Sequence, residues 1–457
     1  MLQGSKELFE GLYIYDKWNW EAKHPVIRID LNNGNYATAE SIVEILNINL
    51  QSNADRLGVE YKQYSQANIG ASFADLIQQT KNKYNTQVAV LIDEYDKPIL
   101  DNITNKTQAA VARDVLRNFY GAIKPNDSYL RHVFITGVSK FSKLNLFSGL
   151  NNLEDITIDQ RYATITGYTH HDIETTFSDY TQGVDLEEVR RWYNGYNYLG
   201  EPVYNPFDVL LFFSKDNTFD NYWWETGNPK FLIDKLVENP QRLPNLQNIK
   251  VSKNTLNNFD VEHIDLVALL WQTGYLTFDS KEVILGVAEY KMKVPNKEVQ
   301  LSLNGLFFDY LTKLGNESTL KTDLAKLFLK ADMQGVEQHL ISLFASIPNT
   351  NYIKNNISRF EGYYASVMYA FLCSIGFDVR AEDYTSEGRI DMTLIGPDQI
   401  FILEFKVDQP AEKAIQQIKA KRYYEKYTAQ GKGIYLIGIH FSSEKRNLTD
   451  FKWETLK

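Results

Sequence analysis

The chain has 457 residues, a formal net charge of −10, and 44% hydrophobic and 13% aromatic residues. This composition is typical of a folded chain of about three domains, and the acidic balance argues against non-specific coating of nucleic acid. The single cysteine, Cys373, excludes a disulfide framework and any zinc site built from cysteines. We expect a cytoplasmic protein, because the chain has no apolar run of about 18 residues and no secretory leader pattern.

Before about residue 170, short apolar runs alternate with helical patterns. Buried strands are predicted at residues 24–31, 86–96 and 131–138, with a possible fourth at 162–169. Between them, residues 39–57 and 111–123 carry the spacing of amphipathic helices. This alternation with continuous apolar strands predicts a parallel α/β sheet.

From about residue 171 to 345 the pattern is mainly helical and aromatic. Residues 265–280 followed by 290–299 predict a helix packed against a small hairpin, as in winged-helix modules. The tryptophans and tyrosines of the first half are expected to form a packed lid core rather than a base-stacking platform: Trp192, Tyr193, Tyr196, Trp223 and Trp224. An Asn-rich stretch at 349–358 predicts a linker, which gives domains at 1–170, 171–345 and 346–457.

The C-terminal domain is predicted to contain a helix at 361–375, a β-hairpin, a helix at 411–428 and a strand at 433–441. The hairpin turns at Gly396-Pro397-Asp398. With a two-residue loop, Asp391 lies directly opposite Glu404, whereas a three-residue loop shifts it by one position. Like charges that face each other across a strand pair destabilise it, so a divalent cation is the obvious candidate to offset them.

Glu404 and Lys406 are two residues apart and therefore project from one face of their strand. Two carboxylates at a sheet edge suit Mg²⁺ (or Mn²⁺), which keeps several waters for a substrate phosphate. The metal would activate water and stabilise charge at the scissile phosphate, and Lys406 would position the water or neutralise the developing charge. The alternative is a surface hairpin with an ordinary Glu-Lys pair.

Two further features extend this site. Glu361 begins a predicted helix and either contributes a third carboxylate or only interacts with the helix dipole. Gln417 and Tyr424 lie seven apart on one predicted helical face, surrounded by five basic residues: Lys413, Lys419, Lys421, Arg422 and Lys426. From residue 345 onward there are 15 Lys and Arg against 14 Asp and Glu, so an anionic substrate favours this domain. A basic helix suits a phosphodiester backbone, and the alternative is a solvated charged helix.

Together, Glu361, GRID ending at Asp391, EFK from Glu404 to Lys406, and QI at Gln417 resemble the PD-(D/E)xK nuclease superfamily. The resemblance covers about residues 360–457, and no proline precedes Asp391 as is common in that superfamily. It implies catalytic roles for these five side chains, with Asp391, Glu404 and Glu361 as metal ligands.

The rest of the chain resembles the AAA-ATPase-like domains to which such nuclease domains are fused in many bacterial proteins. VAVLIDEYDKPIL has the form of a Walker B strand, and RYATITGY, WYNGY and VYNPFDV also fit that family. The resemblance implies that Asp93 holds Mg²⁺ and Glu94 polarises the attacking water. Thr136, Ser139 or Lys140 would then read the γ-phosphate.

The Walker A loop is the one gap in this resemblance, because GxxxxGK[ST] occurs nowhere. The chain resembles an N-terminally truncated member. The usual strand order, 5-1-4-3-2, would place the absent strand between residues 131–138 and 162–169. Asp93 and Glu94 are then expected to be vestigial, and we expect no ATP hydrolysis.

The favoured function is Mg²⁺-dependent phosphodiester hydrolysis on DNA or RNA. An alternative from another class is a non-enzymatic interaction or regulatory protein in which both active sites are relics. A nucleotide-dependent switch acting in a complex is the third possibility.

Overall fold

The protein was analysed as a computed structural model that describes residues 1–139, 146, 150–224, 249–257, 259–260, 263–312, 318–347 and 361–456. It divides into two compact units, each of which is described by itself. The first contains residues 1–156 and 252–273, and the second contains residues 157–251 and 274–457. No helix in the described part of the chain is long and apolar enough to cross a membrane. The domain boundaries at 170 and 345 remain predictions, and the linker expected at 349–358 lies outside the described residues.

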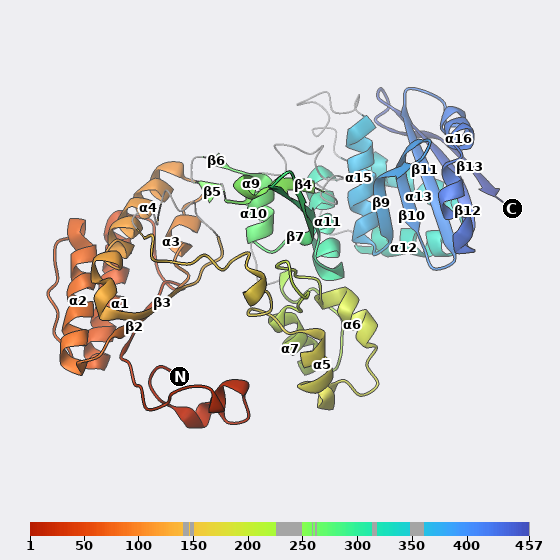
Figure 1. The fold of residues 1–457 in the computed structure, drawn as a ribbon. Helices are drawn as coiled ribbons and strands as arrows, with labels where there is room; N and C mark the ends of the chain where they lie inside the picture. Colours follow the sequence, from red (N-terminus) through yellow and green to blue (C-terminus); the bar gives the residue numbers. More distant parts are fainter. Residues whose placement is uncertain are drawn as a thin grey trace. The chain divides into compact units, whose positions relative to one another are not determined.

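The first unit contains the predicted parallel sheet (Figure 1). Its strands are β1 (Val26–Asp30), β2 (Val88–Asp93) and β3 (Leu130–Ile135), paired in parallel in that order. The helices and short strands of this unit are α1 (Ala39–Leu57), α2 (Ile69–Tyr84), α3 (Lys97–Leu100), α4 (Lys106–Tyr120), α9 (Lys253–Asn257), β5 (Phe259–Asp260), β6 (His263–Ile264) and α10 (Leu266–Gln272). If β1, β2 and β3 are strands 2, 3 and 4 of the expected arrangement, the observed order β3-β2-β1 corresponds to its 4-3-2 part.

Local sequence sets the limits of α1. The Thr38 and Ser41 side chains form a capping box at its start, and Gly58 ends it with a left-handed φ of 62°. The helix therefore covers residues 39–57, as its apolar spacing predicts.

The predicted fourth strand at 162–169 is wrong. The segment begins with the end of a 3-10 helix (Gln160–Tyr162) and continues as a turn. Only Tyr168 makes an isolated bridge, to Tyr204. The apolar side chains of this segment do not form a buried face, because the Ile165 side chain is 60% exposed. Residues 162–169 therefore add no strand beside β3.

The second unit begins with a helical aromatic region. Its elements before residue 347 are α5 (His170–Thr175), α6 (Leu186–Tyr193), α7 (Pro206–Ser214), β4 (Ile249–Ser252), β7 (Thr277–Ile284), β8 (Val287–Lys293), α11 (Lys297–Thr312), α12 (Ser318–Leu329) and α13 (Met333–Ser346). Of the five aromatic residues expected in one packed core, Tyr193 lies in a buried cluster with Tyr204, Phe212 and Tyr222, and Trp192 packs against it. Tyr196 contacts Trp223, and Trp223 and Trp224 contact Tyr275. The predicted hairpin is β7-β8, and β4 extends it to a three-stranded sheet. The helix before it, α10, belongs to the other unit, so a winged-helix packing stays a prediction.

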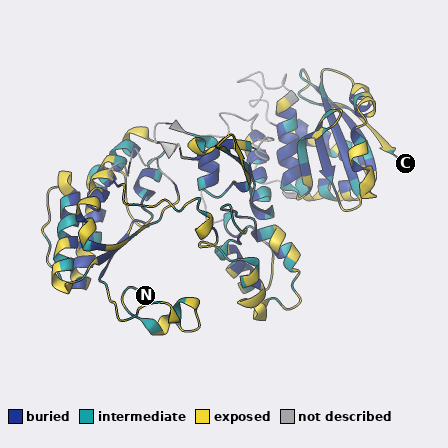
Figure 2. Cartoon of the chain, viewed as in Figure 1, coloured by how far each residue is buried: buried dark blue, intermediate teal, exposed yellow. Residues whose placement is uncertain are grey.

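The C-terminal domain is a five-stranded mixed sheet in the order β13-β12-β11-β10-β9 (Figure 1). Strands β11 and β12 are parallel and the other neighbours are antiparallel. Its elements are α15 (Glu361–Ser374), β9 (Asp378–Thr385), β10 (Gly388–Ile395), β11 (Gln399–Val407), α16 (Ala411–Ala420), β12 (Gly433–Ser442) and β13 (Asn447–Leu456). The residues of the central strands are mostly buried (Figure 2). The structure confirms the first helix, the hairpin and β12, while sequence analysis missed β9 and β13.

The predicted helix at 411–428 is two elements. Helix α16 ends at Ala420, Arg422 adopts a left-handed φ of 46°, and a 3-10 segment, η11, covers Tyr423–Gln430. This turn places Tyr423 and Tyr427 in the core beneath the sheet. Gln417 and Tyr424 therefore do not share one helical face, because core burial of the two tyrosines overrides the helical pattern.

Candidate metal centre at the β10–β11 hairpin

The hairpin turn determines which residues meet across β10 and β11. Ile395 pairs with Ile400, and the Gly396 N–H donates to the Gln399 carbonyl at 2.8 Å. Pro397 and Asp398 are thus the two-residue loop of the first alternative. Continuing this register past the Met392–Leu403 pair brings Asp391 to Glu404.

Beyond the Met392–Leu403 pair, the carboxyl groups of Asp391 and Glu404 accept hydrogen bonds from backbone N–H groups of the two strands. The Asp391 N–H donates to Glu404 Oε1 at 3.3 Å, and the Phe405 N–H donates to Asp391 Oδ2 at 2.8 Å. These reciprocal bonds hold both acids at the junction of the strands, so the acids do not point to opposite faces.

Burial makes the electrostatics of Glu404 unusual. Its side chain is fully buried, and this desolvation, followed by the nearby charge of Asp391, raises the pKa of Glu404 to about 9. The Lys406 ammonium, 3.5 Å from Glu404 Oε2, opposes the increase only in part. Without a bound cation, burial and the charge of Asp391 favour the protonated form of Glu404.

Lys406 and Gln417 complete the arrangement. Gln417 of α16 donates through Nε2 to Glu404 Oε2 at 2.8 Å. Lys406 Nζ donates to the Phe405 carbonyl at 2.9 Å. Glu404 therefore faces α16, whereas Phe405 contacts Phe441 on the other side of the strand. Four of the five residues singled out by sequence are brought together here.

Glu361 is the fifth of these residues. It begins helix α15, but its side chain lies outside the described residues. Among the residues whose side chains are described, no three of His, Cys, Asp and Glu gather as a metal site would require. A third protein ligand for the acid pair is therefore a prediction only.

The acid pair itself fits a hard divalent cation. Two carboxylates in contact share one proton because their charges repel, and a cation in the place of that proton would neutralise both. Oxygen donors and a small number of protein ligands are what Mg²⁺ takes at phosphate sites. The residues present are consistent with Mg²⁺ or Mn²⁺ held by Asp391 and Glu404.

The basic side chains near α16 are partly neutralised. Lys419 pairs with Glu454 at 2.7 Å, Arg422 lies 3.7 Å from Glu425, and Lys426 pairs with the buried Asp383. Each of these contacts lowers the charge that the expected phosphodiester interface would offer.

Asp383 of β9 is a structural centre that sequence analysis missed. Its carboxylate accepts from Thr393 Oγ1 at 2.9 Å and also from Lys426 Nζ and the Tyr427 hydroxyl. Burial raises the pKa of Tyr427 to about 12, with the Asp383 hydrogen bond adding to the shift. The network fastens η11 to β9 and β10. The acids of this polar strand, Asp378, Glu382 and Asp383, have no local sequence feature that distinguishes the buried one.

We expect Asp383→Ala to lower the free energy of unfolding by about 2–4 kcal/mol, because it leaves buried hydroxyl groups without an acceptor. The matched control is Asp378→Ala on the same strand, whose side chain is 58% exposed, with an expected effect within about 0.5 kcal/mol. Denaturant unfolding of both variants measures the difference. Equal losses would show that the network does not stabilise the domain.

The acids of the Walker B-like strand lie at the carboxyl end of β2. Asp93 is level with Asp30 of β1 and accepts from Thr136 Oγ1 at 2.6 Å. Glu94 has a left-handed φ of 53°, and burial followed by the charge of Asp96 raises its pKa. Their roles toward a nucleotide remain predictions.

Sequence analysis missed Asp96, which is fully buried and holds the segment that follows β3. It accepts from the Val138 N–H at 3.2 Å, the Ser139 N–H at 2.5 Å and the Ser139 hydroxyl. Ser139, one of the side chains expected to read a γ-phosphate, is thus engaged within the protein. Lys140, another of them, lies outside the described residues.

Comparison with known proteins supports both halves of this picture. Residues 1–147 match the family described as "Predicted AAA-ATPase", and residues 359–451 match the PD-(D/E)XK nuclease superfamily. A protein of Azotobacter chroococcum mcd 1, described as "Uncharacterized protein in vnfD 5'region", is 43% identical over 463 aligned residues. The alignment covers 100% of this chain and 88% of that protein. No solved structure matches the chain.

Proposed function

The chain belongs to the family that joins a predicted AAA-ATPase-like domain to a PD-(D/E)XK nuclease superfamily domain, and on this basis we propose that it is a divalent-metal-dependent nuclease. The proposed reaction is hydrolysis of a phosphodiester bond in DNA or RNA. The observation that supports it is the pairing of Asp391 with Glu404 through backbone N–H bonds to both carboxylates, with Lys406 and Gln417 beside Glu404.

Each side chain has a separate part in this proposal. Asp391 and Glu404 would hold Mg²⁺ or Mn²⁺, with Glu361 as a candidate third ligand. When bound, the metal supplies Lewis-acid stabilisation of the scissile phosphate and activation of water. The Gln417 amide keeps Glu404 oriented through its hydrogen bond to Oε2. Lys406, once released from the Phe405 carbonyl, would place its ammonium beside the attacking water or the developing negative charge.

A cleavage assay tests the proposal directly. Purified chain is incubated with single-stranded and double-stranded DNA and RNA in Mg²⁺ or Mn²⁺, with an EDTA-treated sample as control. We expect products only with metal and only from at least one of these polymers. An interaction or regulatory protein with relic sites would give no metal-dependent product on any of them.

Metal binding is also testable without a substrate. We expect Mn²⁺ or Mg²⁺ to raise the melting temperature by several degrees, because a ligand at 100 times its Kd stabilises the folded state by about 2.7 kcal/mol. EDTA should reverse the shift. Asp391→Asn should abolish it, whereas Glu412→Gln, an exposed acid on α16, should retain it. A shift of equal size in Asp391→Asn would place the metal elsewhere.

A further inference from the structure

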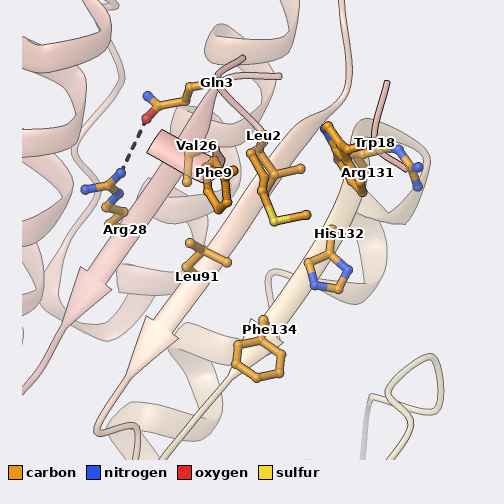
Figure 3. Close-up of a pocket in the computed structure, with 11 residues that line it drawn as sticks. Leu2, Gln3, Phe9, Trp18, Val26, Arg28, Leu91, Arg131, His132 and Phe134 are labelled. Carbon is orange, nitrogen blue, oxygen red and sulfur yellow. Dashed lines mark hydrogen bonds between the residues drawn. The ribbon is translucent and has the colours of Figure 1, made fainter. Parts of the chain in front are cut away.

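The two faces of the β1-β2-β3 sheet are covered differently. On one face, buried side chains of β1 and β2, among them Ile27, Ile29 and Val90, pack beneath the helices. On the other face, Phe134 of β3 is 37% exposed and borders a cavity whose far wall is the N-terminal segment (Figure 3). Parallel sheets are normally covered on both faces, and on this face the cavity lies between the N-terminal segment and the strands.

The cavity has a volume of about 640 Å³. Its walls are mainly apolar and are formed by Leu2 and Phe9 of the N-terminal segment and by Val26, Leu91 and Phe134 of the three strands (Figure 3). Small-molecule sites are usually apolar clefts of roughly 300–1,000 Å³ with a few placed polar groups. The size and lining of this cavity are therefore those of a ligand site.

The polar groups of the cavity are basic or hydrogen-bond donors. Arg28, Arg131 and His132 line it, and no acidic residue does, in a chain whose net charge is −10. Arg28 donates to Gln3 Oε1 at 3.3 Å, and this pair is visible at one side of the cavity (Figure 3). Arginine presents a planar fork of donors that suits a carboxylate or phosphate.

A further observation indicates that a ligand with a hydrogen-bond acceptor would suit this cavity. The indole N–H of Trp18, another lining residue, is buried and has no acceptor among the described residues. A buried donor without a partner carries a desolvation cost.

We propose that this cavity binds an anionic amphiphile whose apolar chain lies along Leu91 and Phe134. Its carboxylate or phosphate would pair with Arg28 or Arg131, and an oxygen of the ligand would accept from the Trp18 N–H. The apolar walls favour the apolar chain of the ligand, and the basic side chains, with no acidic residue beside them, favour an anionic head group. This site is separate from the acid pair and does not depend on nuclease activity.

Calorimetric titration of the full chain with decanoate, decyl phosphate and decanol tests the proposal. We expect saturable binding of decanoate or decyl phosphate, at least about tenfold tighter than decanol, because a charge-assisted hydrogen bond is worth that ratio. The two anions distinguish a carboxylate site from a phosphate site. Trp18→Phe should lower the affinity for the anion without changing the affinity for decanol.

Variants locate the head group. Arg28→Gln or Arg131→Gln should lower the affinity for the anion about tenfold, while Arg113→Gln, on α4, should leave that affinity unchanged. Filling the space with Leu91→Trp should prevent binding of all three probes. Decanol binding as tightly as decanoate, or anion binding that neither arginine affects, would overturn the proposal. Light scattering that shows a dimer which binds no probe would assign the face to a second copy instead.

Discussion

Replacing Glu404 with Gln or Asp391 with Asn is expected to reduce metal-dependent cleavage by about a thousandfold or more. The charge stabilisation that a bound metal provides is worth several kcal/mol, and about 1.4 kcal/mol corresponds to a tenfold change in rate. Both substitutions keep the size of the side chain but remove a charged ligand. Single-turnover cleavage rates at saturating Mg²⁺ or Mn²⁺ measure the effect.

The same two variants separate a catalytic role from a structural one. Without metal, each replaces one of two facing acids, which are costly to bury together, with a neutral amide, so the melting temperature should stay unchanged or rise. Glu412→Gln serves as the matched control for both measurements, since it changes an exposed acid on α16. A clear loss of stability in the metal-free variants would make the acids structural. That result would favour the interaction-protein alternative.

Glu298→Gln is expected to give the largest change in the pH dependence of stability. Glu298 of α11 and Asp208 of α7 are both fully buried, and the charge of Asp208 acts on Glu298. The Trp223 N–H donates to Asp208 Oδ1 at 2.9 Å, and the Trp224 N–H donates to Glu298 Oε1 at 3.1 Å. The pair thus joins the two helices to the backbone of the tryptophan segment.

The sign of the effect follows from the direction of the pKa shifts. Burial, followed by the charge of Asp208, raises the pKa of Glu298 to about 9, and burial raises the pKa of Asp208 to about 6. The folded state therefore binds more protons than the unfolded state between about pH 4.5 and 9, and its stability falls as pH increases through this range. Each unit of pKa shift is worth about 1.4 kcal/mol, so the loss amounts to a few kcal/mol.

Unfolding of the second unit at pH 5, 7 and 9 tests this expectation. Wild type should lose stability across the series, and Glu298→Gln should lose a few kcal/mol less, because its amide carries no charge at any of these pH values. The control is Glu282→Gln, an exposed strand residue that should follow wild type. Because Glu404 contributes a loss of the same sign, only the difference between variants is interpreted. A pH profile of Glu298→Gln that coincides with wild type would contradict the raised pKa of Glu298.

Local sequence was sufficient for those features that depend on near neighbours along the chain. The capping box at Thr38 and the glycine at 58 delimit α1. The two-residue turn after Gly396 determines the register that joins Asp391 to Glu404, and the spacing of two places Lys406 beside Glu404. These rules operate over a few residues, which is why the core of the candidate site could be predicted.

Burial of particular side chains was decided by tertiary structure alone, because it depends on segments far apart in sequence. Asp383 is enclosed only when η11 folds back onto β9, and Asp208 comes near Glu298 only in the folded second unit. The same long-range packing bends the chain at Arg422 and leaves residues 162–169 without a strand partner. Periodicity in the sequence shows that a segment has an apolar face, but only the folded chain supplies the surface that covers it.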